Sequence, residues 1–195
     1  MNSISSVCVY CASSRQIAPV YVDAARELGT LLGERGIRLI NGAGSIGLMR
    51  VSADAAMAAG GKVTGVIPQF MMDEGWGYDR LTELRVVDSM HQRKQLMADL
   101  SDAVIALPGG IGTLEELLEI ITWKQLGLYL KPIVILNTDN YYQPLLAMLR
   151  QAAEQHFMRP THADLWQVAT TPQEAVGLIH TTPAWDPNLR KFAAI

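Results

Sequence analysis

The sequence has little of what marks secreted, membrane-bound or nucleic-acid-binding proteins. Only two of its 195 residues are cysteine, too few for a disulfide framework, and no apolar run approaches the roughly 20 residues that a membrane-spanning helix needs. Its 16 lysines and arginines are outnumbered by 19 aspartates and glutamates, whereas nucleic-acid-binding domains usually carry a basic excess. The first residues lack the charged start of a secretory signal. We therefore expect a cytoplasmic protein whose partners are neither nucleic acids nor membranes.

The two cysteines, Cys8 and Cys11, form the pattern C-x-x-C. A redox pair with this spacing usually begins a helix, and a zinc site needs more ligands than two thiols. Cys8 instead lies within the apolar run 7–10, and none of the four histidines is spaced like a further ligand. We expect two reduced, structural thiols and no metal site.

Hydrophobic residues make up 49% of the chain and charged residues 18%, which is typical of a folded domain with a full core. Apolar runs of strand length alternate with segments of helical period. We expect strands at 6–10, 37–41, 62–67, 83–87, 102–107, 132–136 and 165–168, and helices at 20–35, 46–59, 90–100, 113–126, 142–155 and 172–180. This alternation predicts a single α/β domain over residues 1–195, with a mostly parallel sheet and helices on both faces.

Two segments fit neither period. Residues 69–82 hold several large apolar side chains with little to bury them against, and a loop of this length is uncommon unless it is functional. We interpret it as a flap over a site or as part of a subunit contact. Residues 183–195 are interpreted as a C-terminal tail.

A glycine-rich turn joins the strand at 102–107 to the helix at 113–126. It reads P-G-G-x-G-T from Pro108 to Thr113. Glycine lets a ligand approach the backbone closely, and the free N–H groups and positive dipole end of a helix start favour an anion. The turn is therefore either a phosphate-binding element or a strand-to-helix connection without a ligand.

A second glycine turn, Gly42-x-Gly44-x-x-Gly47, matches the dinucleotide fingerprint G-x-G-x-x-G. That fingerprint normally follows the first strand of a fold, whereas this one follows the second. The next strand also ends in Pro68 and Gln69 rather than in the acidic residue that would hold a ribose. We therefore do not expect NAD or NADP, although the turn falls at the ligand-binding end of the sheet.

Glu116 has two interpretations. With Thr113 it forms the pattern T-x-x-E, a capping box in which the glutamate closes back on the start of the helix. Alternatively, it is a carboxylate with a chemical role beside the phosphate turn, which requires a compensating cation. Arg93 and Lys94 in the M-H-Q-R-K run that begins at Met90 offer one, because charge-assisted contacts to phosphate contribute roughly 1.5–3 kcal/mol each.

Taken together, these patterns resemble the Lonely Guy family of cytokinin riboside 5′-monophosphate phosphoribohydrolases. The specific features are the order of M-x-x-R-K, from Met90 to Lys94, before P-G-G-x-G-T-x-x-E, from Pro108 to Glu116. The resemblance extends over about residues 7–157. It implies a Rossmann-like homodimer that hydrolyses the N-glycosidic bond of an adenosine monophosphate, without a metal or organic cofactor.

The resemblance also implies roles for individual residues. Arg93 and Glu116 correspond to the family's catalytic pair. The substrate-contacting positions that follow from the resemblance and from the two turns are Ser14, Gly44, Ser45, Met90, Lys94, Gly109, Gly110, Ile111, Gly112, Thr113, Leu114, Glu115 and Thr122. A further substrate-contacting glutamate falls near Glu74, where the flap aligns poorly.

The chain departs from the family at three positions around the second turn. Ala43 replaces the usual middle glycine, Asn41 stands where tyrosine is common, and Arg50 stands where glycine is usual. These departures either tighten the second turn or change which base is accepted, so they bear on substrate preference more than on the fold.

Two other functions compete with hydrolysis. One is a non-catalytic nucleotide or cofactor carrier on the same Rossmann-like frame. The other is a pyridoxal-phosphate decarboxylase, since relatives have carried the label lysine decarboxylase; that chemistry needs a Schiff-base lysine.

Overall fold

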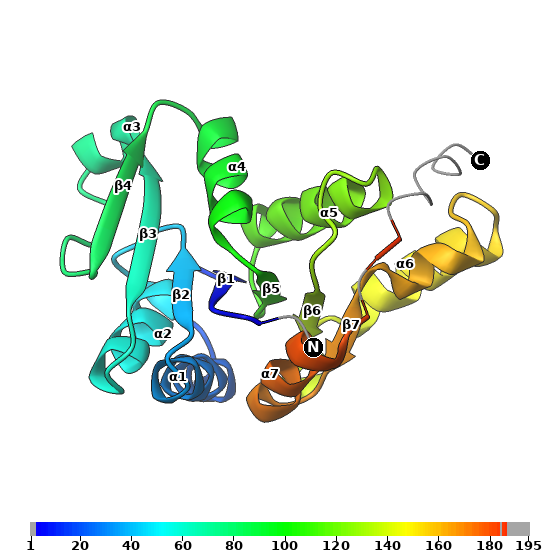
Figure 1. Ribbon diagram of the computed structural model, residues 1–195, viewed down its shortest axis with the longest axis horizontal. Helices are drawn as coiled ribbons and strands as arrows, with labels where there is room; N and C mark the ends of the chain where they lie inside the picture. The colour runs from blue at the N-terminus through cyan, green and yellow to red at the C-terminus, as the bar shows by residue number, and fades with distance from the viewer. Residues whose placement is uncertain (1–2, 184, 187–195) are drawn as a thin grey trace.

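The computed structural model describes residues 3–183 and 185–186, which form one seven-stranded sheet with helices on both sides (Figure 1). The strands are β1 (Ser6–Tyr10), β2 (Arg38–Asn41), β3 (Val63–Pro68), β4 (Glu83–Val87), β5 (Ala103–Ala106), β6 (Ile133–Leu136) and β7 (Gln167–Ala169). The helices are α1 (Pro19–Glu34), α2 (Gly47–Ala58), α3 (Gln69–Asp73), α4 (Met90–Leu100), α5 (Ile111–Gln125), α6 (Gln143–Glu154) and α7 (Pro172–Thr181), with the 3-10 helices η1 (Thr138–Asn140) and η2 (Pro160–Leu165). All neighbouring strands pair in parallel, which confirms the α/β, Rossmann-like fold.

The central strands are buried on both faces. In β1, Val7 and Val9 belong to the hydrophobic cluster that α1, α2 and α7 cover, while Cys8 and Tyr10 belong to the cluster that α4 and α5 cover. Figure 1 shows these two groups of helices on opposite sides of the sheet. Since neither face meets water, such strands appear in the sequence as continuous apolar runs rather than alternating ones.

The strand order β4-β3-β2-β1-β5-β6-β7 reverses its direction of growth beside β1. The chain first builds outward from β1 to β4, and α4 then returns it to β5 on the other side of β1. Ligands of open α/β sheets bind beyond the carboxyl ends of the strands at such a reversal. The two glycine turns follow β2 and β5, so both lie at the carboxyl ends of these inner strands.

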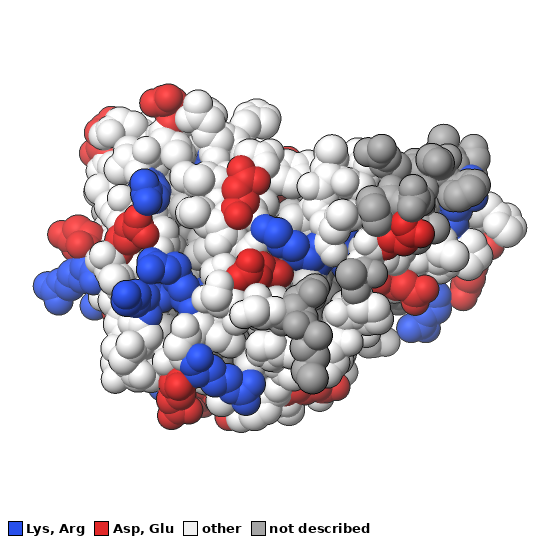
Figure 2. Space-filling model, viewed as in Figure 1, with Lys and Arg blue, Asp and Glu red and all other residues white. Residues whose placement is uncertain are grey.

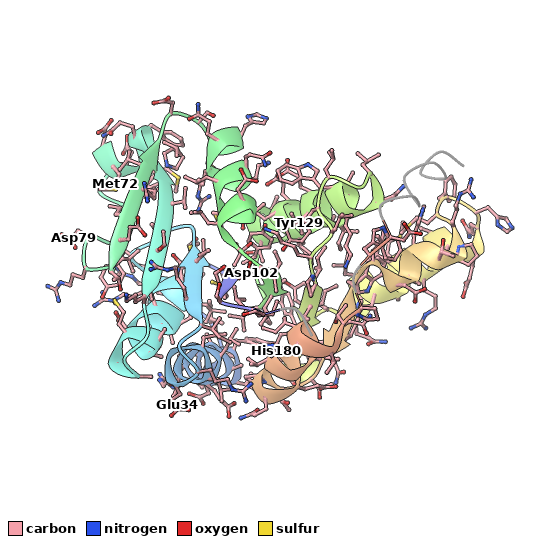
Figure 3. All side chains as sticks on the ribbon, viewed as in Figure 1. Glu34, Met72, Asp79, Asp102, Tyr129 and His180 are labelled. Atoms are coloured by element: carbon pink, nitrogen blue, oxygen red, sulfur yellow. The ribbon has the colours of Figure 1, made fainter. Side chains whose placement is uncertain are left out.

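At the amino ends of the central strands, a polar contact joins the start of β1 to the start of β5. Asp102, labelled in Figure 3, precedes β5, and its Oδ2 accepts hydrogen bonds from the backbone N–H groups of Ser5 (2.9 Å) and Ser6 (3.0 Å).

Figure 2 shows acidic and basic side chains interspersed over the face that it presents, without a continuous basic patch. Within the described residues, no helix is both long and apolar enough to cross a membrane.

The helix starts are largely as expected. Ser89 caps α4 by accepting a hydrogen bond from the Gln92 N–H (3.2 Å), and Thr171 caps α7 by accepting one from the Glu174 N–H (3.2 Å). Three expectations need correction: residues 69–82 contain the short helix α3, α5 begins two residues before Thr113, and the 3-10 helices were not predicted. Cys8 and Cys11 are buried free thiols, as expected. Most of the predicted tail lies outside the described residues.

Candidate active site

A cavity of about 580 Å³ opens at the carboxyl ends of β1, β2 and β5. It lies at the reversal of the strand order, and segments from across the sequence contribute to its wall. Its lining consists of Cys11, Ala12, Ser13, Ser14, Gly42, Gly44, Ser45, Ile46, Met49, Met71, Trp76, Arg93, Gly110, Ile111, Gly112, Thr113 and Glu116.

One wall of the cavity is the start of α5. Gly110 is the residue before the first helical turn and caps it with no side chain, and the N–H groups of Ile111, Gly112 and Thr113 have no acceptor within the helix. A Cβ on Gly109 would lie 2.1 Å from Thr113 Oγ1, whereas one on Gly110 or Gly112 would meet nothing within 4 Å. Gly109 is thus required by packing, while the other two glycines keep the backbone N–H groups open to a ligand.

The capping-box interpretation of Glu116 is wrong. Because α5 begins at Ile111, Thr113 is already its third residue and makes no side-chain cap. Glu116 therefore lies in the second turn, where its carboxylate forms an ion pair with Arg93 of α4 instead of closing on the helix start.

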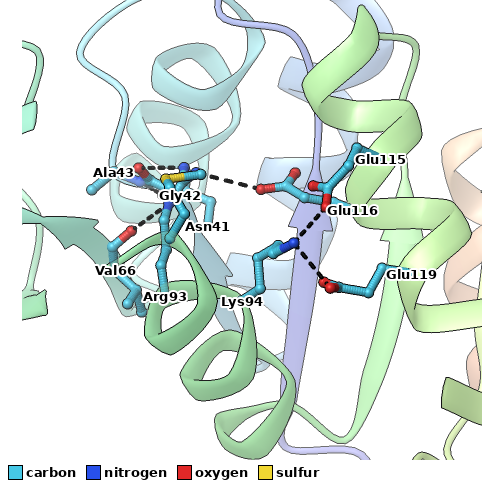
Figure 4. A network of polar contacts seen from close by, with 10 residues as sticks. Asn41, Gly42, Ala43, Val66, Arg93, Lys94, Glu115, Glu116 and Glu119 are labelled. Carbon is cyan, nitrogen blue, oxygen red and sulfur yellow. Dashed lines mark hydrogen bonds and ion pairs between the residues drawn. The ribbon is translucent and has the colours of Figure 1, made fainter. Parts of the chain in front are cut away.

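The Arg93–Glu116 pair joins α4 to α5 (Figure 4), and both residues line the cavity. Arg93 Nη1 lies 3.5 Å from Glu116 Oε1, and the two side chains are only 6% and 11% exposed. The remaining guanidinium nitrogens are anchored to backbone: Nε donates to the Val66 carbonyl (3.0 Å) and Nη2 to the Gly42 carbonyl (3.0 Å). A Cβ on Gly42 would lie 1.7 Å from Nη2, so this guanidinium position requires a glycine.

Burial raises the pKa of Glu116 to about 7. The Arg93 charge opposes the shift, and the neighbouring Glu115 charge adds to it. A carboxyl group with such a pKa exchanges its proton near neutral pH, which is the property required of a general acid or base. A buried titratable group in a cavity is also a common sign of a functional site.

Lys94 occupies a different environment from Arg93. Its ammonium forms an ion pair with Glu115 and another with Glu119, the latter at 2.9 Å (Figure 4). These contacts hold Lys94 between α4 and α5, outside the lining of the cavity. Its charge offsets the two glutamates that flank the turn containing Glu116.

The structure brings most of the predicted site together. The predicted residues that line the cavity are Ser14, Gly44, Ser45, Arg93, Gly110, Ile111, Gly112, Thr113 and Glu116. Those outside its lining are Glu74, Met90, Lys94, Gly109, Leu114, Glu115 and Thr122. Among these, Met90 Sδ lies 3.9 Å from Arg93 Nη1, and Thr122 Oγ1 donates to the Leu118 carbonyl (2.7 Å). Glu74 is exposed at the end of α3.

The largest residues that the sequence did not assign to the site are Met49, Met71 and Trp76. Trp76 is 52% exposed and lines the cavity from the segment interpreted as a flap. Backbone hydrogen bonds tie this segment to the second glycine turn, from the Ser45 N–H to the Trp76 carbonyl (2.9 Å) and from the Tyr78 N–H to the Ala43 carbonyl (2.8 Å). The sequence signals for this segment were the absence of a period in residues 69–82 and the large apolar side chains with little to bury them against.

The three departures from the family pattern lie in or next to the second glycine turn. Asn41 Oδ1 accepts from the Ala43 N–H (2.9 Å), and Asn41 Nδ2 donates to the Met49 carbonyl (3.2 Å). Ala43 has a φ of 55°, a left-handed conformation that glycine adopts more readily. Arg50 lies over the Tyr78 ring, with Cζ 5.3 Å from its centroid. Asn41 thus holds this turn through its side chain, and Ala43 takes a left-handed conformation in it without being a glycine.

Known proteins resemble this chain along most of its length. The family model described as "Possible lysine decarboxylase" matches residues 49–179. The chain is 48% identical over 188 residues to the probable cytokinin riboside 5′-monophosphate phosphoribohydrolase LOGL2 of Oryza sativa, covering 96% of this chain and 76% of that protein. The chain belongs to the LOG family. The Arabidopsis thaliana member LOG3, a cytokinin riboside 5′-monophosphate phosphoribohydrolase, is 47% identical over 170 residues, covering 87% and 79% of the two chains.

More distant proteins share the fold of this LOG-family chain. The molybdenum cofactor binding protein of Rippkaea orientalis superposes with a TM-score of 0.69 at 24% identity, covering 90% of this chain and 95% of that one. The molybdenum cofactor carrier protein of Chlamydomonas reinhardtii gives a TM-score of 0.69 at 22% identity, covering 91% and 96%. At this level of identity the likeness concerns the fold alone.

Proposed function

We propose that this protein hydrolyses the N-glycosidic bond of nucleoside 5′-monophosphates, cytokinin riboside 5′-monophosphates or AMP, releasing the free base and ribose 5-phosphate. The observation that supports it most is the buried Arg93–Glu116 pair, which lies in the same cavity as the open amides of α5. A site that only binds phosphate has little use for a carboxylate there, because two negative groups repel each other.

The start of α5 binds the 5′-phosphate of the substrate. The N–H groups of Ile111, Gly112 and Thr113 and the Thr113 hydroxyl bind the 5′-phosphate, assisted by the helix dipole. Fixing the phosphate uses binding energy remote from the reacting bond to place the ribose beside Glu116.

Glu116 then acts on the ribose. The C1′–N9 bond breaks with its electron pair leaving on the base, and the sugar develops oxocarbenium character. The Glu116 carboxylate faces this positive charge and takes a proton from the attacking water, whose oxygen bonds to C1′; the proton passes to the departing base. Arg93, anchored by two backbone carbonyls, keeps the carboxylate oriented. This hydrolysis requires no metal or organic cofactor.

The other wall of the cavity suits the base. Ile46, Met49, Met71 and Trp76 line it with apolar surface, and methionine and tryptophan side chains adapt well to flat aromatic rings and aliphatic chains. This wall favours an adenine that carries an apolar N6 substituent, as in a prenylated cytokinin, over adenine itself.

Further features of the proposal concern assembly and location. We propose a cytoplasmic location. We also propose a homodimer, which is supported by the large apolar side chains exposed on α5 and just after it, with Leu126 45% and Leu128 72% exposed. Static light scattering at micromolar concentration tests the dimer, and a monomer there contradicts it.

The assay that tests the reaction incubates the protein with AMP and with N6-isopentenyl-AMP and measures free base and ribose 5-phosphate by chromatography. We expect both products in equal amounts. Binding without base release would instead support the nucleotide-carrier alternative. The decarboxylase alternative lacks its key residue, because no lysine of the described chain lines the cavity.

A further inference from the structure

Two consecutive tyrosines that follow the neighbouring strand β6 contact the turn after β5. Tyr141 Oη donates a hydrogen bond to the Gly109 carbonyl (2.6 Å), and Tyr142 Oη donates one to the Leu107 carbonyl (2.7 Å). Both come from the loop between β6 and α6, and neither lines the cavity. They therefore contact the proposed phosphate-binding turn from outside the cavity.

The loop is shaped to present these tyrosines. Asp139 and Asn140 have φ values of 51° and 57°, a left-handed conformation that aspartate and asparagine adopt more readily than other residues with a side chain. Asn137 accepts a hydrogen bond from the Tyr142 N–H at its side-chain oxygen (2.7 Å) and donates its own N–H to the Ala169 carbonyl (2.7 Å).

The Tyr141 ring is fixed independently of its hydroxyl group. It packs edge-to-face against Tyr21, with centroids 5.7 Å apart, and against Tyr142, with centroids 5.2 Å apart. The hydroxyl is therefore held in place whether or not it has an acceptor. Removing the hydroxyl alone should leave the packing of the three rings intact.

The contact fixes the orientation of one peptide group. In a trans peptide the C=O and the following N–H point in opposite directions. The Gly109 carbonyl is held toward Tyr141, so the Gly110 N–H is directed to the opposite side, and Gly110 lines the cavity. The Gly110 N–H has no acceptor among the described residues. Because glycines flank this peptide on both sides, little else prevents it from rotating.

We infer that Tyr141 is a positioning residue that orients the Gly109–Gly110 peptide toward the phosphate of the bound nucleotide. The inference rests on the proposed function for the identity of the ligand. Tyr141 acts through the turn and does not touch the substrate. It adds the Gly110 N–H to the donors that α5 already offers.

The test compares Tyr141→Phe with Tyr21→Phe, a matched variant that keeps the same three rings and the hydrogen bond to Gly109. Affinity for ribose 5-phosphate is measured by calorimetry, and kcat and KM are measured with AMP. We expect Tyr141→Phe to weaken ribose 5-phosphate binding and raise KM by at least about tenfold, the effect of losing one hydrogen bond to a charged ligand. Its kcat should change less than about twofold, and Tyr21→Phe should match the wild type throughout.

Equal affinities in Tyr141→Phe and the wild type would overturn the inference, as would the same loss in both variants or a lowered melting temperature with unchanged affinity. A wild-type protein that binds no ribose 5-phosphate would also overturn it. The failure of the proposed function is distinguishable: the wild type would then bind ribose 5-phosphate and release no base, while the difference between the two variants would persist.

Discussion

Arg93 Nη1 lies 3.5 Å from Glu116 Oε1, and both side chains are almost wholly buried. Removing two such charges from water costs about as much as their attraction returns, so a buried ion pair seldom adds stability. Its location in the cavity, rather than any gain in stability, explains why the chain has it.

Replacing Glu116 should therefore stabilise the protein at alkaline pH. The pKa of Glu116 is raised by burial from its ordinary value of 4.5 to about 7, so ionisation makes the folded state roughly 3 kcal/mol less stable above pH 7 than below pH 4.5. Glu116→Gln removes this penalty and keeps a polar side chain of the same size beside Arg93. Denaturant unfolding should find the variant more stable at pH 8 and equal to the wild type near pH 4.5.

Glu174 provides a control of opposite sign. Hydrogen bonds from the Thr170 N–H and hydroxyl lower the pKa of Glu174, so its carboxylate adds stability above the ordinary pKa and loses it as pH falls. Glu174→Gln should be slightly less stable than the wild type at pH 8. A Glu116→Gln variant that is also less stable at pH 8 would contradict the assigned environment of Glu116.

The rate of base release should depend on pH through the same group. Burial raises the pKa of Glu116 to about 7, and the proposed reaction uses the carboxylate form, so kcat should rise as pH increases from 6 to 8 and then level off. Measuring kcat at saturating nucleotide keeps the titration of the free substrate's phosphate out of the profile. A profile that is flat between pH 5.5 and 8.5 would show that Glu116 does not act as the base.

Much of this site could be predicted from the sequence, because its main elements are local. The glycine turn between an apolar run and a helical period identified the end of β5, and the M-x-x-R-K run fell on α4 as expected. The role of Glu116 could not be settled, since T-x-x-E has the same spacing whether the helix begins at Thr113 or two residues earlier. Only the structure shows that Gly110 precedes the first turn.

Other parts depended on contacts between distant segments. Lys94 forms ion pairs with Glu115 and Glu119 because α4 and α5 pack side by side, and no local pattern encodes that approach. Trp76 reaches the cavity because Ser45 and Ala43 hold its segment through backbone hydrogen bonds, which depend on backbone position rather than residue type.

A substitution at Gly112 tests the binding of phosphate at the start of α5. A methyl group on Gly112 meets no protein atom within 4 Å but would enter the cavity where the phosphate is proposed to bind. Gly112→Ala should therefore fold normally, with stability unchanged or raised by up to about 1 kcal/mol, while KM rises at least tenfold. Gly177→Ala in α7, which also meets nothing within 4 Å, is the control and should keep full activity. An unchanged KM in Gly112→Ala would mean that the anion binds elsewhere.

The apolar wall predicts substrate preference. Removing the indole in Trp76→Ala should raise KM for N6-isopentenyl-AMP by about tenfold, the effect of roughly 1–2 kcal/mol of lost apolar contact, and should affect AMP less. Phe70→Ala is a suitable control, because Phe70 is a neighbouring exposed aromatic residue, 51% exposed, that does not line the cavity. Equal changes for the two nucleotides in Trp76→Ala would assign the base to another wall.

A crystal structure of the Glu116→Gln variant with N6-isopentenyl-AMP tests the central claim most directly. The account predicts the 5′-phosphate within hydrogen-bonding distance of the N–H groups of Gly112 and Thr113, with C1′ of the ribose beside the side chain at position 116. A phosphate bound away from the start of α5, with Arg93 and the side chain at position 116 turned from the ribose, would contradict it.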